Sequence, residues 1–112
     1  MSFVVLNSGN IDEVLADSKI ALIYFRADWC GPCEVFNDIY VSISGNHEDV
    51  VFATIDIEDE PDLTDDFDID SVPTLVIIRD QNLVFSHVGI VSPRDLESLI
   101  EQARSMNLSD VG

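Results

Sequence analysis

The segment Ile20–Phe25 is almost entirely apolar over six consecutive residues, and no other feature constrains the fold as strongly. A strand with one face in water alternates apolar and polar side chains, whereas a strand covered on both faces is apolar throughout. A strand of this second kind lies inside a sheet that is packed on both sides. The segment therefore predicts a layered α/β protein built around a central strand.

The rest of the chain alternates strand and helix patterns around this segment. Further strands are predicted at Phe3–Leu6, Val50–Ile57, Thr74–Arg79 and Leu83–Val88. Helices are predicted from Asn10, over about 33–44, around Leu63–Phe67 and from Ser92. The order β-α-β-α-β-α-β-β-α requires parallel strands joined by right-handed crossovers and then an antiparallel hairpin. We expect one domain over residues 1–112, with a central mixed sheet of about five strands, about four flanking helices and a tail from about 107 to 112.

Three helix ends carry local signals. Asn10, with Glu13 three residues later, has the pattern of a capping box. Ser92 before Pro93 indicates the start of the last helix. Gly45 and the residue after it indicate the end of the second helix in the manner of a C-cap.

Length and composition are those of one ordinary domain. A chain of 112 residues, 46% of them apolar, can bury a core without disulfide staples. The start, Met1–Asn7, has neither the basic region nor the apolar run of a signal peptide. No apolar stretch approaches the ~20 residues of a membrane span. We therefore predict a cytoplasmic protein whose thiols are reduced by default.

The charge balance excludes two classes of partner. Twenty-two acidic residues face five basic ones, for a formal net charge of −17. Such a surface repels nucleic acid and anionic membranes, so we expect neither as a partner. Nine of the carboxylates lie in Asp56–Asp70, which holds no basic residue. A solvated face, adaptation to a salt-rich cytoplasm and a docking face for a basic partner all remain open for this segment.

The chemistry is concentrated in Cys30-Gly31-Pro32-Cys33, which follows the apolar strand and opens a helix. The N–H groups and positive potential of a helix N-terminus stabilise a thiolate, the form that attacks disulfides. The two-residue spacer brings Cys33 within reach of a mixed disulfide on Cys30. Pro32 fixes one backbone angle in a turn where its missing N–H costs nothing. Gly31 leaves the approach to the sulfur open.

Other uses of two cysteines are less consistent with the sequence. A disulfide between residues three apart closes too small a loop to hold a fold together. Half a zinc site needs two more ligands, and the two histidines, His47 and His87, do not have finger-like spacing. We expect both histidines to be solvated or packing residues. Two inert buried cysteines would not need this position between strand and helix. The residues favour a redox pair.

The sequence resembles the thioredoxin family over nearly its whole length. Ala27–Cys33 is similar to the family's active-site loop, and Val72-Pro73-Thr74 is similar to its loop with a cis-proline facing the disulfide. Gly89 matches a glycine that lets the end of the last strand approach the same groove. The resemblance implies the thioredoxin fold and reduction of protein disulfides.

The resemblance also implies the roles of individual residues and the partners. Cys30 would be the exposed nucleophile and Cys33 the buried resolving thiol. Substrate would dock on Trp29, Gly31, Pro32, Val72, Pro73 and Gly89, with backbone hydrogen bonds at Val72. The partners would be a thioredoxin reductase fed by NADPH and client proteins that contain disulfides. No bound cofactor or metal is expected, because the disulfide is the redox group, and we expect a monomer.

Three residues depart from the family pattern. Tyr24 replaces a buried aspartate that is credited with handling the proton of the resolving cysteine, so its presence puts the speed of that step in question. Glu34 and Thr54 replace two lysines, which makes the local field less favourable to a thiolate. An alternative function is therefore a binding or redox-sensing module of the same fold with little reductase turnover.

Overall fold

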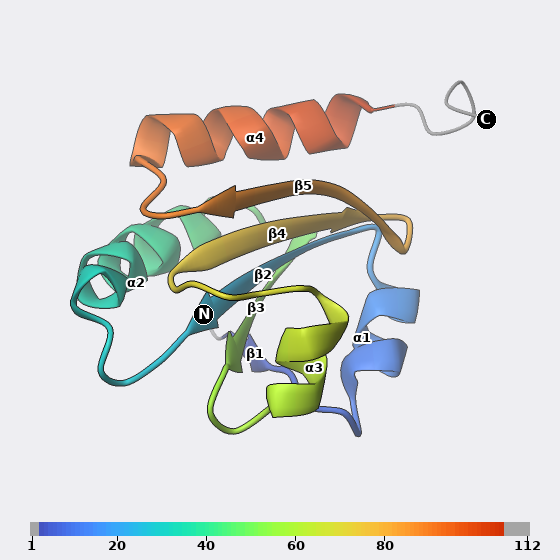
Figure 1. Cartoon of the computed structure of the whole chain (residues 1–112). Helices are drawn as coiled ribbons and strands as arrows, with labels where there is room; N and C mark the ends of the chain where they lie inside the picture. Colours follow the sequence, from blue (N-terminus) through green and yellow to red (C-terminus); the bar gives the residue numbers. More distant parts are fainter. Residues whose placement is uncertain (1–2, 107–112) are drawn as a thin grey trace.

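A computed structural model describes residues 3–106 of the chain, so the predicted tail at 107–112 lies outside the described residues. The strands form one five-stranded sheet in the order β1-β3-β2-β4-β5 (Figure 1). The strands are β1 (Val4–Val5), β2 (Ile20–Arg26), β3 (Val50–Asp56), β4 (Thr74–Arg79) and β5 (Asn82–Val88). The helices are α1 (Ile11–Asp17), α2 (Gly31–Ser44), α3 (Pro61–Asp66) and α4 (Pro93–Ser105). The predicted fold class, a mixed sheet flanked by helices, is confirmed.

The central position of β2 agrees with its apolar sequence. It pairs in parallel with β3 and antiparallel with β4. All six residues of Ile20–Phe25 are buried, as expected of a strand covered on both faces. In this register Tyr24 lies between Thr54 of β3 and Leu75 of β4.

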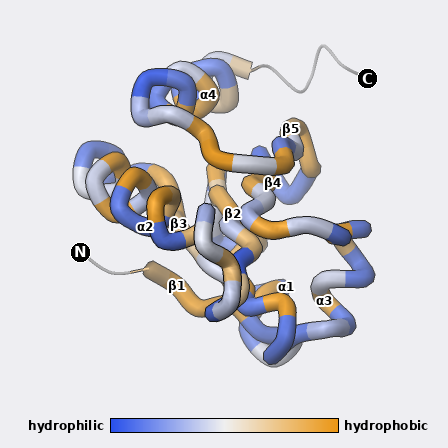
Figure 2. The backbone as a smooth tube through the Cα atoms, turned by 60° about the vertical axis from the view of Figure 1, so that its left-hand side comes forward, coloured by the Kyte–Doolittle hydropathy of each residue, from blue (hydrophilic) through white to orange (hydrophobic). Residues whose placement is uncertain are grey.

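The side chains of β2 alternate between two apolar cores, one on each face of the sheet. Leu22 and Tyr24 belong to the core beneath α2 and α4, and Ile23 and Phe25 belong to the core beneath α1 and α3. We call the first core the site face, because it also contains both cysteines, and the second the opposite face. The chain around α3 is mostly hydrophilic (Figure 2).

The first helix begins where predicted but is not capped as predicted. Asn10 is its N-cap residue, yet its side chain makes no capping hydrogen bond. Instead Asn10 Oδ1 accepts the N–H of Asn7 at 2.8 Å, and Asn10 Nδ2 donates to the carbonyl of Val5 at 3.0 Å. The asparagine therefore closes the turn that leaves β1, and the capping-box prediction was wrong. A side chain can satisfy only one such set of partners at a time.

The other helix ends agree better with their signals. Ser92 Oγ accepts the N–H of Asp95 at 3.1 Å, so the predicted cap of α4 is confirmed. Helix α2 starts at Gly31, two residues earlier than predicted, because Cys30 occupies the N-cap position. The helix ends at Gly45 as predicted, but φ there is −68°, so the glycine is not a left-handed cap.

The antiparallel hairpin is tighter than its sequence indicated. Asp80 and Gln81 both have positive φ, 50° and 69°, which is the backbone of a two-residue hairpin turn. Strand β5 consequently starts at Asn82, one residue before the predicted strand Leu83–Val88.

Helix α4 is tied by charge to the loop between α2 and β3. Arg104 makes two hydrogen bonds to the carboxylate of Asp49, 3.0 Å from Nε and 2.8 Å from Nη2. The hydrogen bond with Arg104 holds the pKa of Asp49 below its ordinary value. His47, at 3.1 Å from Arg104 Nη2, also contacts Glu97. The His47 ring also stacks on Phe52, with ring centroids 6.5 Å apart, so His47 packs as expected and makes these polar contacts in addition.

Within residues 3–106, no helix has both the length and the apolar character that a membrane span requires.

Candidate redox site

The two cysteines form a disulfide at the N-terminus of α2, with their Cα atoms 5.3 Å apart. Cys30 is the N-cap residue, and its Sγ accepts the backbone N–H of Cys33 at 3.1 Å. Cys33 lies inside the first turn. Negative charge on the Cys30 sulfur would therefore face an N–H donor and the positive end of the helix.

Solvent exposure does not distinguish the two sulfurs. The exposed fraction is 4% for Cys30 and 2% for Cys33. The expectation that Cys30 is exposed is therefore wrong for the disulfide form. Trp29, at 65% exposed, and the spacer residues Gly31 and Pro32 form the accessible surface next to it.

A second loop faces the disulfide and contains the cis peptide bond between Val72 and Pro73 that the resemblance implied. The carbonyl of Pro73 accepts the N–H of Gly89 at 2.8 Å, which joins this loop to the end of β5. Gly89 has φ of 105°, a conformation that side chains other than glycine rarely adopt. A Cβ there would meet only His87 Nε2 at 4.0 Å, so backbone conformation, not crowding within the chain, requires this glycine.

The backbone of Val72 is free for pairing. The carbonyls on either side are occupied, because Ser71 accepts from Thr74 Oγ1 at 2.7 Å and Pro73 accepts from Gly89. Within residues 3–106 neither the N–H nor the carbonyl of Val72 has a hydrogen-bond partner. The Val72 side chain is half-buried against the site face. An extended peptide could therefore add its backbone to this position.

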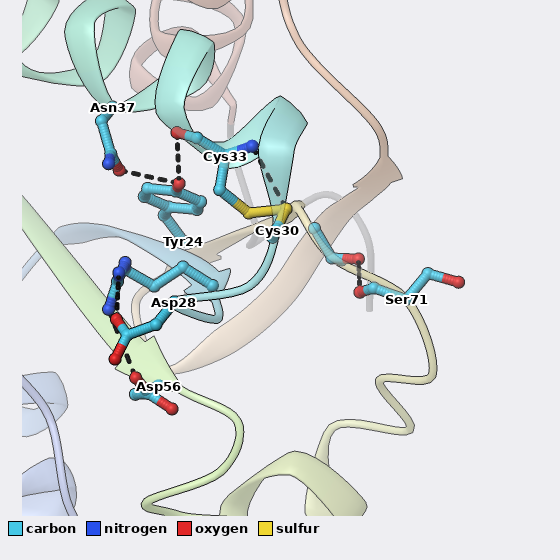
Figure 3. Close-up of a disulfide and its surroundings, with 9 residues drawn as sticks. Tyr24, Asp28, Cys30, Cys33, Asn37, Asp56 and Ser71 are labelled. Carbon is cyan, nitrogen blue, oxygen red and sulfur yellow. Dashed lines mark hydrogen bonds and ion pairs between the residues drawn. A yellow bond between two sulfur atoms is a disulfide. The ribbon is translucent and has the colours of Figure 1, made fainter.

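Tyr24 lies directly beneath the disulfide (Figure 3), and its side chain is 1% exposed. Its hydroxyl is 3.0 Å from the carbonyl oxygen of Cys33 and 2.8 Å from Asn37 Oδ1. The hydroxyl has one proton, so it donates to one of these oxygens at a time. Burial raises the pKa of Tyr24 to about 12, although nearby Arg26 acts in the opposite direction. At neutral pH the phenol is thus fully protonated and cannot serve as a general base.

Arg26 is a charged residue of the site that sequence reasoning missed. Its Nη2 is 2.9 Å from Asp28, and its Nη1 is 3.3 Å from Asp56. The hydrogen bond to Asp28 raises the pKa of Arg26 above its ordinary value, so the guanidinium stays charged. Arg26 therefore partly neutralises the negative charge of Asp28, which is unfavourable to a thiolate on Cys30. The sequence offered one signal for the pairing of Arg26 with Asp28: the two residues lie two positions apart at the end of a predicted strand.

Asn37 was also missed, although its spacing gave a signal. It follows Cys33 by four residues in α2, so the two residues share a helix face that packs toward Tyr24. Glu34, in contrast, is exposed in the first turn and has no ion pair within residues 3–106. Thr54 lies opposite Tyr24 in β3 and brings no positive charge. The positive charges that the family pattern has at these two positions are therefore absent from Glu34 and Thr54.

Comparisons with known proteins agree with this geometry. The sequence model of the Thioredoxin family matches residues 2–102. The chain belongs to the thioredoxin family. It is 38% identical to thioredoxin 2 of Streptomyces coelicolor, over 98% of this chain and 82% of that protein. It is 30% identical to a thioredoxin of Coprinus comatus, over 89% of this chain and 95% of that protein.

Solved structures of thioredoxins superpose closely on the fold. A variant of the Halobacterium salinarum thioredoxin matches with a TM-score of 0.84 and 30% identity, over 93% of this chain and 92% of that chain. The oxidised mitochondrial thioredoxin 3 of Saccharomyces cerevisiae matches with a TM-score of 0.82 and 26% identity, over 89% of this chain and 94% of that chain.

Membership in the family establishes the kind of activity. The protein is a thiol–disulfide oxidoreductase with Cys30 and Cys33 as its redox-active pair, and the comparisons do not favour the alternative of a binding module. Its substrates are proteins that contain disulfides, and members of the family are usually reduced by a reductase. Members are typically free of bound cofactors, and residues 3–106 contain no cluster of three or more metal-ligating side chains.

Proposed function

We propose that the reduced protein attacks substrate disulfides through Cys30 and releases the reduced product through Cys33. The observation that carries this assignment is the position of the two sulfurs on α2. Cys30 Sγ lies at the N-cap and accepts the Cys33 N–H, whereas Cys33 lies within the first turn. A thiolate is stabilised at the first position, so Cys30 is the better nucleophile.

The exchange balances in two steps. The Cys30 thiolate bonds to one sulfur of the substrate disulfide, whose other sulfur leaves as a thiolate and takes a proton from water. Cys33 then loses its proton and attacks the Cys30 sulfur, which forms the Cys30–Cys33 bond and frees the second substrate thiol. Two electrons pass from the protein to the substrate. Because Tyr24 stays protonated, we assign the proton of Cys33 to solvent rather than to a buried base.

The substrate would dock on the surface around the disulfide. Trp29 offers exposed apolar area, and Val72 offers an unpaired backbone N–H and carbonyl. Gly31 and Pro32 leave the approach to Cys30 open, and Pro73 and Gly89 hold the facing loop in place through their hydrogen bond. This arrangement supports binding of an extended segment on either side of the substrate cysteine.

We further propose that a thioredoxin reductase supplies the electrons from NADPH, and that the protein acts as a monomer in the cytoplasm. These assignments rest on membership in the thioredoxin family and on the likeness to a bacterial thioredoxin. Reduction of the purified disulfide form by NADPH and a bacterial thioredoxin reductase tests the electron source. Absence of NADPH oxidation, in a protein that dithiothreitol can reduce, would contradict it.

Two cysteine variants test the assignment of roles. Cys30→Ser should abolish reduction of insulin disulfides, because no thiolate remains at the helix N-terminus. Cys33→Ser should still attack but should remain bound to substrate as a mixed disulfide, which mass spectrometry of the non-reduced complex detects. Equal trapping of substrate by Cys30→Ser would show that the roles are reversed. Loss of trapping by both variants, with native circular dichroism, would contradict the proposed function.

A further inference from the structure

The redox site and the acidic segment share one edge of the sheet. Strands β1, β2 and β3 are parallel, so their carboxyl ends meet at the same edge. The loop to Cys30 leaves β2 there, and the segment Asp56–Asp70 leaves β3 there. Arg26 pairs with Asp56 in the register, and its carbonyl accepts the N–H of Ile57 at 3.0 Å. The acidic segment therefore starts beside the loop that leads from β2 to Cys30.

Carboxylates also stand on each of the three chain segments around the disulfide. We call the following exposed residues the acidic rim: Asp28, Glu34, Asp68, Asp70 and Asp95. They belong to segments 26–34, 68–73 and 89–95, which carry two arginines, Arg26 and Arg94. Arg26 is engaged with Asp28 and Asp56, and Arg94 has no ion pair within residues 3–106. The three segments together keep an excess of three negative charges.

The surface inside the acidic rim is open to a peptide. Trp29 is 65% exposed and Ile90 is 42% exposed, and the backbone of Val72 is unpaired. In Figure 3 Asp28 and Ser71, the residue after Asp70, lie on opposite sides of Cys30. A chain that crosses the sulfur would therefore place its flanking side chains near carboxylates on both sides.

We infer that this site favours substrates with lysine or arginine next to the disulfide cysteine, an inference that rests on the proposed function. A cationic side chain on either side of that cysteine is attracted by the acidic rim, whereas an acidic one is repelled. Negative potential around a small docking surface also raises the encounter rate of cationic segments. The same charges that make the local field less favourable to a thiolate thus select the substrate.

Three disulfide peptides test this inference. They are identical except for the two residues that flank one cysteine, which are lysine, glutamine or glutamate. The pre-reduced protein is mixed with each peptide, and the second-order rate constant of reduction is measured. Each value is divided by the rate constant for dithiothreitol, because a cationic neighbour also speeds attack by any thiol. At ~20 mM salt we expect about tenfold faster normalised reduction of the lysine than of the glutamate peptide, falling below about twofold at ~1 M sodium chloride.

A pair of double variants locates the effect. Glu34→Gln with Asp70→Asn removes two charges of the acidic rim, and the lysine-to-glutamate ratio should fall to about threefold. Asp17→Asn with Glu48→Gln removes two exposed charges that precede β2 and β3, at the other edge of the sheet. Seven-residue strands separate the edges by about 20 Å, so the second variant should keep the full ratio.

The outcomes separate the inference from the proposed function. Equal normalised rates for the three peptides would overturn the inference while leaving the reductase activity intact. Equal loss of preference in both double variants would also overturn it, because net charge alone would then explain the result. Failure to reduce even the glutamine peptide would overturn the proposed function, and the inference with it.

Discussion

The two faces of the sheet bury different kinds of side chain, although they are built from neighbouring residues of the same strands. The site face contains a cluster of rings in edge or tilted contact, with centroids 4.9 Å apart for Tyr24 and Phe36 and 5.2 Å apart for Tyr24 and Tyr40. The opposite face is mainly aliphatic, with Ile23 and Ile55 fully buried. The site face therefore carries polar atoms in its core, whereas the opposite face supplies apolar packing.

The buried hydroxyls show what this difference means for function. Tyr40 Oη lies 3.0 Å from the carbonyl oxygen of Leu22 and 2.9 Å from that of Ala53 and donates its one proton to one of them at a time, so it joins a helix to two strands. Tyr24 Oη joins β2 to α2 directly beneath Cys33. A change on the site face thus alters both packing and the surroundings of the disulfide. A change on the opposite face should alter stability alone.

The replacement Tyr24→Asp should have the largest effect. It deletes a buried ring and places a carboxyl in its position, so stability should fall by at least about 3 kcal/mol. In the folded variant the carboxylate can accept the proton of Cys33, and resolution of a mixed disulfide near pH 7 should be about tenfold faster. Attack by Cys30 should change much less. Single-turnover kinetics on a preformed Cys30 mixed disulfide, followed across pH, measure the two steps separately.

A milder variant keeps this test decisive if Tyr24→Asp does not fold. Asn37→Asp introduces a carboxylate at 2.8 Å from the Tyr24 hydroxyl without removing a ring, and Asn37 is only half-buried. It too should speed resolution at neutral pH, by a smaller factor. Unchanged resolution in both folded variants would mean that proton removal from Cys33 does not limit the exchange.

The replacement Ile23→Ala tests the opposite face. Ile23 is 0% exposed, and truncation of such a side chain costs about 2–5 kcal/mol through lost burial and the cavity left behind. Urea unfolding measures this loss. The reduction potential of the disulfide and the rate of insulin reduction should match those of the original protein wherever both are folded. A tenfold loss of activity in folded Ile23→Ala would show that the two faces are coupled.

The same contrast explains what the sequence could predict. The apolar run of β2, the hairpin and the Ser92 cap depend on neighbours along the chain, and the structure confirmed each of them. Residue pairs that meet only after folding were missed, such as Tyr24 with Asn37. The side chain of Asn10 was assigned to its own helix, but a turn from β1 offered it other partners. Local patterns predict which elements form and in what order, whereas packing decides which polar atoms meet.

For the site, too, features that depend on local sequence were predicted, whereas contacts that form only on folding were missed. The motif at Cys30 and Cys33 was recognised because its chemistry depends on spacing, and the resemblance supplied the facing loop at Pro73. The burial of Cys30 could not be predicted, because it depends on the packing of the site face around the disulfide. The role of Arg26 depends on Asp56, thirty residues away, so the local charge at Asp28 alone gave an incomplete account.

Titration of the tyrosines tests whether the site face is as dry as its burial indicates. The chain has two tyrosines, and burial raises the pKa of Tyr24 to about 12 and that of Tyr40 well above its ordinary value. A raised pKa means that folding favours the neutral phenol. This contribution to stability is complete below pH 10, the ordinary pKa, and is lost as the pH rises from 10 through about 12. Phenolate absorbance should therefore appear about two pH units later in the native protein than in denaturant. Native titration near pH 10 would contradict a dry core.

The replacement Tyr24→Phe should have the smallest effect and gives the sharpest comparison. It removes one hydroxyl and keeps the ring, so stability should fall by about 1 kcal/mol. Resolution of the mixed disulfide should change by less than about twofold, because a phenol with a pKa of about 12 is not a base at neutral pH. Tyr40→Phe is the matched control: it removes a buried hydroxyl of the same face that contacts strand carbonyls instead of Cys33. If Tyr24→Phe slowed resolution tenfold and Tyr40→Phe did not, the Tyr24 hydroxyl would take part in the chemistry, and solvent would no longer account for the proton of Cys33.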